Sequence, residues 1–234
     1  MRVIALAAQK GGTGKTTLAG HLAVQAERKG AGPVAVIDTD AQGSLSAWWN
    51  ERQVETPRFA ATDFARLPYD LQKLEEAGVR LAVIDTPPAI TMAIRRVITV
   101  ADLVLVPTRP SPHDLRAIIA TVDIVEDAGR PLIFVINSAT QRARITSDAA
   151  ITLSQYGTVA PTTIHHRTDF ATSMIDGRTV MEFKPASRSA QEIETLWDYV
   201  ASRLARQETK APVQAAPVRP PMRRGTFGRR VATR

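Results

Sequence analysis

The sequence predicts a single α/β domain, in which helices cover both faces of a mostly parallel, twisted sheet. Short apolar runs alternate with longer segments of helical periodicity along most of the chain. The runs have few polar interruptions, which is typical of parallel strands that are buried on both faces. The chain has 234 residues, 44% of them hydrophobic, which is enough for one substantial core. The alternation of strand and helix favours a mostly parallel sheet.

Five apolar runs are predicted to form the main strands, and an edge strand is added at 57–62 by PRFAAT. The five runs are VIALAA at 3–8, PVAVID at 33–38, RLAVID at 80–85, DLVLVP at 102–107 and PLIFVIN at 131–137. Helical periodicity fills the segments between them. The predicted helices cover 15–29, 66–77, 89–99, 112–128 and 144–155.

A last helix is predicted over 189–206. Large apolar side chains recur along it at helical spacing, so it has one apolar face that we expect to pack on the core. These side chains are Ile193, Leu196, Trp197, Val200 and Leu204.

Basic side chains are concentrated after this helix. Residues 207–234 contain seven basic side chains and one acidic one, whereas the other 206 residues contain 23 and 22. Prolines and glycines interrupt the segment, and it has no helical stripe. We therefore predict one domain over 1–206 and a disordered basic tail over 207–234. Because the domain itself is nearly neutral, a DNA-binding face on it would require local clustering of cations.

The composition also excludes several classes of protein. The chain has no cysteine, which excludes disulfides and cysteine-bound metals or iron–sulfur clusters. No apolar run approaches the roughly 18 residues that indicate a membrane-spanning helix, and the N-terminus lacks the layout of a signal peptide. We therefore expect a cytoplasmic protein without stable membrane insertion.

The segment AAQKGGTGKTT at 7–17, between the first strand and the first helix, is close to a phosphate-binding P-loop. That motif has a Gly, four free residues and then Gly-Lys-Ser/Thr. Gly14, Lys15 and Thr16 fit the motif, but Gln9 stands where the first Gly is expected, and a second lysine, Lys10, opens the loop. The order of strand, glycines, Gly-Lys-Thr and helix still predicts a nucleotide site.

The chemistry of such a loop follows from its backbone. N–H groups between a strand and a helix N-terminus point inward and form a cavity for phosphate oxygens, to which the helix dipole adds positive charge. We expect Lys15 to neutralise β- and γ-phosphate oxygens, the Thr16 hydroxyl to bind Mg²⁺, and Thr17 to reach the α-phosphate. The predicted nucleotide-binding residues of the loop are Lys10, Gly11, Gly12, Thr13, Gly14, Lys15, Thr16 and Thr17.

Acidic residues end two of the predicted strands. Asp38 and Asp40 belong to VIDTD, and Asp85 belongs to LAVIDTPP. An aspartate at the carboxyl end of a parallel strand beside the P-loop strand points into the ligand crevice. Asp85 therefore suits the role of holding a water on Mg²⁺, and Thr16, Asp38 and Asp85 are the predicted metal-site residues. The alternative for Asp38 and Asp40 is that both are simply solvated.

KGGTGKTT, followed by DTDAQGS and VIDTPP, resembles the deviant Walker A motif of the ParA/MinD group of P-loop ATPases, and ParA-type partition proteins in particular. The resemblance covers roughly residues 1 to 205 and includes DFATSMIDGRTVMEFKPASRSAQEIETLW near the C-terminus. It implies a P-loop NTPase domain with ATP and Mg²⁺ as cofactors. It also implies weak ATP hydrolysis that a ParB-like protein or another adaptor stimulates.

The resemblance assigns further roles. It implies that Lys10 reaches across an ATP-dependent homodimer to the nucleotide of the other subunit, and that Asp40 orients the attacking water in switch I. Lys10, Lys15 and Asp40 are therefore the expected catalytic residues. Asn137 is expected to recognise adenine, since an amide can both donate and accept hydrogen bonds. The family usually has Pro where this chain has Ala41, so we expect a more mobile switch I.

Three functions remain open for such an ATPase. In the first, the ATP-bound dimer binds DNA non-specifically, associates with the nucleoid and positions a plasmid, a chromosome region or a protein assembly. The second is a MinD-like positioning ATPase on membranes, although prolines in the tail disfavour an amphipathic helix. The third is a metabolic ATPase of the same fold. The candidate DNA contacts for the first function are Arg167, Arg178, Lys184, Arg188 and Arg203.

Overall fold

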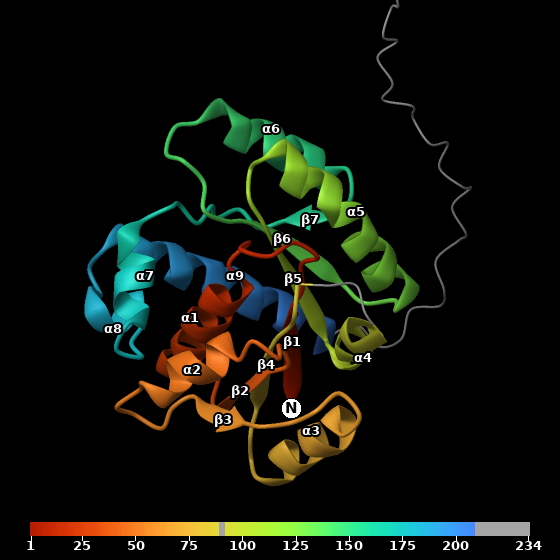
Figure 1. Cartoon of the computed structure of the whole chain (residues 1–234), viewed down its shortest axis with the longest axis vertical. Coiled ribbons are helices and arrows are strands. Elements are labelled where there is room, and N and C mark those ends of the chain that lie inside the picture. Colours follow the sequence, from red (N-terminus) through yellow and green to blue (C-terminus); the bar gives the residue numbers. More distant parts are fainter. Residues whose placement is uncertain (89–91, 209–234) are drawn as a thin grey trace, which may run out of the picture.

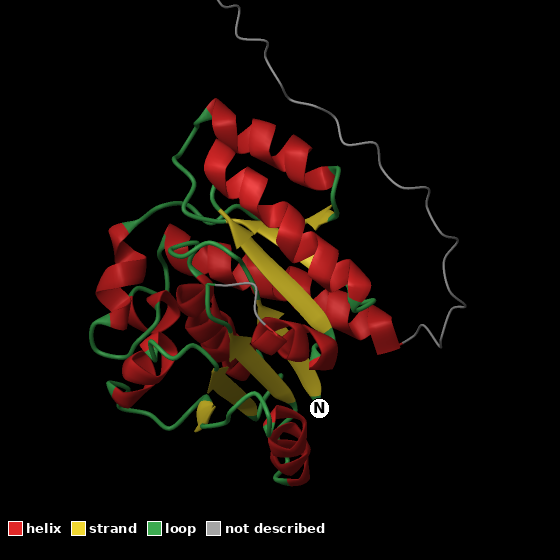
Figure 2. Ribbon diagram, turned by 45° about the vertical axis from the view of Figure 1, so that its right-hand side comes forward, coloured by secondary structure: helices red, strands yellow, loops and turns green. Residues whose placement is uncertain are grey.

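The computed structural model describes residues 1–88 and 92–208. Seven strands form one sheet in the order β3-β2-β4-β1-β5-β6-β7, and every neighbouring pair is parallel. The predicted α/β domain with a mostly parallel sheet is therefore confirmed (Figure 2). The strands are β1 (Arg2–Leu6), β2 (Val34–Asp38), β3 (Arg58–Ala60), β4 (Leu81–Asp85), β5 (Leu103–Thr108), β6 (Leu132–Ile136) and β7 (Thr158–Val159).

Helices cover both faces of the sheet (Figure 1). One face packs against α1, α2, α7, α8 and α9, and the other packs against α3, α4, α5 and α6. The helices are α1 (Lys15–Arg28), α2 (Ser44–Asn50), α3 (Leu67–Glu76), α4 (Met92–Val100), α5 (Pro112–Asp127), α6 (Arg144–Ser154), α7 (Thr168–Met174), α8 (Val180–Phe183) and α9 (Arg188–Glu208).

Alternation along the central strands divides the core into two layers. In β1, Ile4 and Leu6 face the layer of α1 and α9, whereas Val3 and Ala5 face the layer of α4 and α5. All four side chains are at most 6% exposed. The continuous apolar run of β1 therefore reflects burial on both faces, because each face supplies one half of its side chains.

The predicted elements are confirmed, with bounds that differ by up to two residues. Residues 89–91, at the start of the helix predicted over 89–99, lie outside the described residues. The edge strand predicted at 57–62 is β3, which pairs with β2 alone. The sequence analysis missed α2, β7, α7 and α8, which all have seven residues or fewer. Such elements are too short for a reliable periodic pattern.

The last helix extends beyond its predicted end. α9 runs to Glu208, so the first two residues of the predicted tail at 207–234 are helical, and the rest of that tail lies outside the described residues. The five apolar side chains predicted to form its stripe are all buried in the layer that contains α1. In the described part of the chain, no helix has the length and apolar character needed to cross a membrane.

The segment between α7 and α8 packs closely on the end of α2. The guanidinium of Arg52, just after α2, donates to the carbonyl of Gly177 at 2.6 Å and to Glu182 at 2.9 Å. Trp48 of α2 donates from Nε1 to the carbonyl of Arg178 at 3.1 Å, and its ring lies against Gly20 of α1. These contacts join α1, α2 and α8 into one unit.

Gly177 is the tightest point of this packing. It has φ +73°, and a Cβ atom there would lie 2.4 Å from the backbone nitrogen of Arg52. We expect Gly177→Ala to lower the free energy of unfolding by about 3 kcal/mol, because a left-handed alanine is strained and the neighbouring backbone must also move. Urea unfolding of the purified variant measures this loss.

Gly78→Ala is the matched control. Gly78 has φ +83°, but a Cβ atom there meets nothing within 4 Å. Its substitution should cost only the backbone strain, about 1–2 kcal/mol. Equal losses at Gly177 and Gly78 would show that the contact with Arg52 does not constrain the fold.

Candidate functional site

The loop after β1 and the first turn of α1 form one wall of a cavity of about 760 Å³ at the carboxyl edge of the sheet. Gly11, Gly12, Gly14, Lys15, Thr16 and Thr17 line it. Gly12 and Gly14 have φ +72° and +91°, which is the left-handed geometry that lets a loop turn its N–H groups inward. The structure therefore brings together most of the predicted phosphate-binding residues.

Lys15 and Asp85 form the buried centre of the site. Lys15 is 7% exposed and Asp85 is fully buried. Burial raises the pKa of the Asp85 carboxyl to about 7, although a hydrogen bond from the Thr16 hydroxyl opposes the rise. Burial also lowers the pKa of the Lys15 ammonium, while the charges of Asp85 and Asp40 oppose that change. The charges of Lys15 and Asp85 thus stabilise each other, but they do not fully offset the cost of burying both groups.

The donor set fits a nucleotide-bound Mg²⁺ better than a protein-only metal site. Among the described residues, no three His, Asp or Glu side chains converge in a metal-binding cluster. Mg²⁺ in nucleotide sites takes only one or two protein ligands, together with phosphate oxygens and waters. Thr16 donates its hydroxyl proton to Asp85, and within the described chain the second oxygen of Asp85 is buried without a hydrogen-bond partner. Thr16 and Asp85 could therefore hold such an ion, as predicted.

Asp38 has a structural partner that was not predicted. Its Oδ2 accepts hydrogen bonds from the backbone N–H groups of Leu45 and Ser46 at 3.0 and 2.9 Å, so it caps the start of α2. Its Oδ1 accepts from the backbone of Asp40 at 3.0 Å. A role for Asp38 at the metal stays a prediction, since this carboxylate is already satisfied by the protein.

Asp40 is half-buried and lines the cavity. Its Oδ1 accepts from the backbone N–H of Gln42 at 3.0 Å, which folds the segment expected to be switch I into a turn. Ala41, at the tip of this turn, is exposed. The carboxylate of Asp40 thus lines the cavity where nucleotide is expected. The residue that follows it, Ala41, does not stiffen the turn as a proline would.

Asn137 lies against the P-loop. Its side-chain amide donates to the carbonyl of Thr13 at 2.7 Å, and a Cβ atom on Gly14 would lie 2.2 Å from the Asn137 Nδ2. The residue therefore clamps the loop to the end of β6, a contact that the sequence analysis missed. Recognition of adenine by Asn137 stays a prediction, and it would use the face that lines the cavity.

Lys10 is held outside the cavity. Its Nζ lies 2.9 Å from Oδ2 of Asp114, and the two side chains are 43% and 5% exposed. Asp114 lies in the first turn of α5, where Ser111 caps the helix. The other oxygen of Asp114 is buried without a hydrogen-bond partner in the described residues. The second lysine of the loop is therefore paired with an acidic residue of its own chain.

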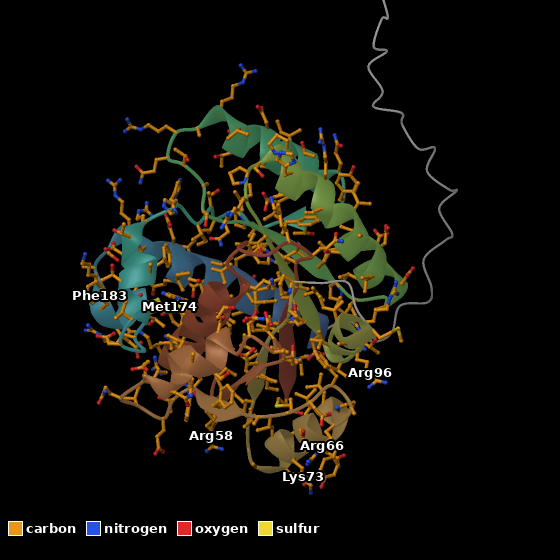
Figure 3. The ribbon with its side chains drawn as sticks, viewed as in Figure 1. Arg58, Arg66, Lys73, Arg96, Met174 and Phe183 are labelled. Atoms are coloured by element: carbon orange, nitrogen blue, oxygen red, sulfur yellow. The ribbon has the colours of Figure 1, made fainter. Side chains whose placement is uncertain are left out.

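The five candidate DNA contacts do not form one patch. Arg178 and Lys184 both lie over the ring of Phe183, at 5.0 and 5.1 Å from its centre, at the α7–α8 corner labelled in Figure 3. Each is also paired with an acid of its own chain, Arg178 with Asp176 at 2.7 Å and Lys184 with Asp169 at 2.8 Å. Arg167 is paired with Glu192 at 2.6 Å and is 16% exposed. Arg203 stacks on Tyr199 and reaches Thr158 of β7.

Arg188 and Arg203 begin and nearly end α9, so they lie about 22 Å apart along the helix axis. Arg188 is exposed. At the α7–α8 corner, Arg178 and Lys184 lie around one ring, and Arg167 stands at the start of α7. The role of all five in DNA binding stays a prediction.

Sequence reasoning missed two charged residues near the P-loop, Asp114 and Arg109. Asp114 had a readable signal, because Ser111 followed three residues later by an acid is a helix-start pattern, close to a capping box. Arg109 follows β5 directly, at the same edge as the P-loop, and lines the cavity. Its position after a predicted strand was visible, but its approach to Gly12 depends on the folded loop.

Comparison with known proteins agrees with this geometry. A family model described as the CobQ/CobB/MinD/ParA nucleotide binding domain matches residues 4–180. Maintenance of carboxysome distribution protein A from Halothiobacillus neapolitanus is 27% identical over 198 residues, which cover 81% of this chain and 91% of that protein. The protein of the same name from Gloeobacter kilaueensis is 42% identical over 123 residues, or 52% of this chain and 55% of that one.

A solved structure shares the fold. The septum site-determining protein MinD of Pyrococcus horikoshii, complexed with Mg-ADP, superposes with a TM-score of 0.71 at 19% identity. The superposition covers 90% of this chain and 99% of that one.

A buried histidine anchors helix α1 and makes the stability of the folded protein depend on pH. His21 is fully buried, with Nδ1 2.7 Å from the carbonyl of Thr17 and Nε2 accepting from the backbone N–H of Val180 at 3.2 Å. Burial lowers its pKa from 6.5 to about 4. Below pH 6.5 the unfolded chain binds a proton that the folded chain excludes. The free energy of unfolding must therefore decrease as the pH is lowered from about 6.5 to about 4.

We expect His21 to account for a loss of about 3 kcal/mol in the free energy of unfolding between pH 7 and pH 4. Urea unfolding across this range, without nucleotide, measures the loss. His21→Gln should remove that part of the pH dependence, whereas His113→Gln, at an exposed site, should retain it. The same pH slope in wild type and His21→Gln would contradict the assignment.

Proposed function

The chain belongs to the CobQ/CobB/MinD/ParA nucleotide-binding family, and on that basis we propose that it is a Mg²⁺-dependent ATPase that dimerises with ATP and positions a cargo on non-specific DNA. The observation that carries the proposal is the second lysine of the P-loop. Lys10 stands beside the cavity with its side chain 43% exposed, and within the described residues its ammonium is paired with Asp114. Such a lysine is available to a phosphate that arrives from outside its own chain.

The proposed switch follows from charge. Two P-loops that face each other bring Lys10 and Lys15 of both subunits together, and this repulsion opposes a dimer without an anion. Bound ATP supplies the anion, so dimerisation becomes conditional on nucleotide. Lys10 would then exchange Asp114 for phosphate oxygens of the partner's nucleotide and stabilise charge that develops during transfer, as an arginine finger does.

The remaining residues have local tasks in this proposal. Lys15 neutralises the phosphates, and Thr16 and Asp85 hold Mg²⁺, which shields the charge of the phosphates when bound. Asp40 orients the attacking water. Proton transfer from that water and release of phosphate would be slow until a ParB-like protein or another adaptor binds and reorganises switch I.

A large protein assembly is the cargo that we favour. Two similar proteins are named for the distribution of carboxysomes, whereas a plasmid or chromosome region is the alternative cargo. A MinD-like membrane-associated ATPase and a metabolic ATPase of this fold are the alternative functions. The second lysine of the P-loop does not separate DNA from membrane, because the resemblance assigns it to the ParA/MinD group as a whole. Arg178 and Lys184, which lie together around Phe183 at the α7–α8 corner, are the observation that favours DNA. A soluble complex at the nucleoid is therefore the proposed location.

The first test separates the two lysines. Lys15→Ala should abolish ATP binding, because it removes the buried cation of the cavity. Lys10→Ala should bind ATP as a monomer but lose the ATP-dependent dimer, because it removes only the ammonium that reaches across the dimer interface. Calorimetry measures binding and light scattering after gel filtration measures mass. An undiminished ATP dimer of Lys10→Ala would refute the crossing role.

The second test concerns DNA. Gel shifts with ATP, ADP and no nucleotide over a salt series should show sequence-blind binding in the ATP state only, which weakens steeply as salt rises. Replacing Arg178 and Lys184 together with Ala should weaken binding on all sequences and reduce the salt slope by about two, one for each lost phosphate contact.

Arg96→Ala is the control for this test, because Arg96 lies on α4, away from the α7–α8 corner (Figure 3). Its variant should bind DNA with the wild-type salt slope. DNA binding that is the same with ATP, with ADP and without nucleotide would contradict the proposed switch. An equal loss from Arg96→Ala would instead show that binding follows overall charge and not this corner.

A further inference from the structure

We propose that Arg109 is a phosphate-binding residue of the nucleotide site within its own subunit. This inference rests on the proposed function, since it assumes that the cavity takes a nucleoside polyphosphate. It adds a cation that no P-loop motif includes and gives it a task different from that of Lys10. Four observations on the described residues carry it.

The first observation is the position of Arg109. The residue follows β5, which lies beside β1 with Leu6 opposite Leu105. Both strands end at the same edge, so Arg109 and the P-loop leave the sheet side by side. Arg109 and Gly12 line the same cavity.

The second observation is how closely the side chain approaches the loop. A Cβ atom on Gly12 would lie 3.1 Å from Nη2 and 3.7 Å from Cζ of Arg109. The guanidinium therefore lies directly over the backbone whose N–H groups are expected to cradle phosphate oxygens. A side chain on residue 12 would push this guanidinium away from the loop, so glycine at this position leaves room for it.

The third observation is the state of the other cations. Of the two arginines that line the cavity, Arg167 is held by Glu192 at 2.6 Å. Lys15 lies near Asp85 and Asp40, and the negative charges of both carboxylates stabilise its ammonium. Lys10 is paired with Asp114. Each of these cations already has an acidic neighbour in its own chain.

The fourth observation is that Arg109 has no such neighbour. Over residues 1–88 and 92–208 its side chain makes no hydrogen bond or ion pair, and the residue is exposed. An exposed arginine with free donors pays little to turn toward an anion beside it. Its planar group can donate two parallel hydrogen bonds to phosphate oxygens, which a lysine cannot do.

The charges of the site explain why this cation is needed. Asp38, Asp40 and Asp85 stand at one edge of the sheet, and Lys10 is neutralised by Asp114 before any dimer forms. Lys15 alone would face both these acids and the phosphates. Arg109 lets the monomer bind nucleotide while Lys10 is still occupied, which separates binding from dimerisation.

The test compares nucleotide affinity in variants of the full chain, measured by calorimetry with Mg²⁺ and either ATP or ADP at protein concentrations below dimerisation. Arg109→Gln should weaken ATP binding by about tenfold, the usual size for a charged hydrogen-bonded pair, and should make the affinity less sensitive to salt. Arg109→Lys should recover part of the affinity, because it restores charge without the planar fork.

Arg116→Gln is the matched control. Arg116 is an exposed arginine of α5 that does not line the cavity, so its variant should bind both nucleotides as wild type does. Thermal unfolding of each variant without nucleotide confirms that it is folded. An equal loss of affinity in Arg116→Gln would overturn the inference, because long-range charge would then explain the effect.

The outcomes separate this inference from the proposed function. If wild type binds ATP, Lys15→Ala does not, and Arg109→Gln binds with wild-type affinity and salt dependence, the inference is wrong and the proposed function stands. If folded wild type does not bind ATP, the proposed function fails and the inference fails with it. A tenfold loss confined to Arg109→Gln supports both.

Discussion

The site depends on the register of three neighbouring parallel strands. Leu6 of β1 stands opposite Asp85 of β4, and Asp85 stands opposite Asp38 of β2. The P-loop, the buried acid and the segment that begins at Asp38 therefore leave the sheet at one level. A shift of one residue in either pair would turn Asp85 to the other face of the sheet, away from Lys15 and Thr16. Apolar side chains on both faces of these strands fix that register.

Around this edge, most of the charged groups pair with other groups of the chain. Lys10 is paired with Asp114, Thr16 donates to Asp85, and Asp38 caps α2. The buried groups that lack a partner in the described residues, among them one oxygen each of Asp85 and Asp114, mark where these pairings are incomplete. A polyphosphate with its cation would offer new partners to the same groups. In this account nucleotide acts by replacing contacts that the chain makes with itself.

The central strands and long helices were predictable because their patterns are local. Val104 and Phe134 belong to continuous apolar runs, and such runs report burial on both faces without any knowledge of neighbours. α2 was missed because its start depends on Asp38, a residue outside the helix. α8 carried a readable capping box, Thr179 with Glu182, but its burial depends on α1. The pairing of Lys10 with Asp114 joins residues 104 positions apart, so no local pattern could predict it.

The central claim is that Lys10 changes partner when ATP binds. A crystal structure of the full chain with Mg²⁺ and a non-hydrolysable ATP analogue tests it most directly. The account predicts a two-fold dimer in which the Nζ of Lys10 has left Asp114 and lies within hydrogen-bond distance of a phosphate oxygen held by the other subunit. A nucleotide bound by one subunit alone, with the Nζ of Lys10 still paired with Asp114 at 2.9 Å, would contradict it.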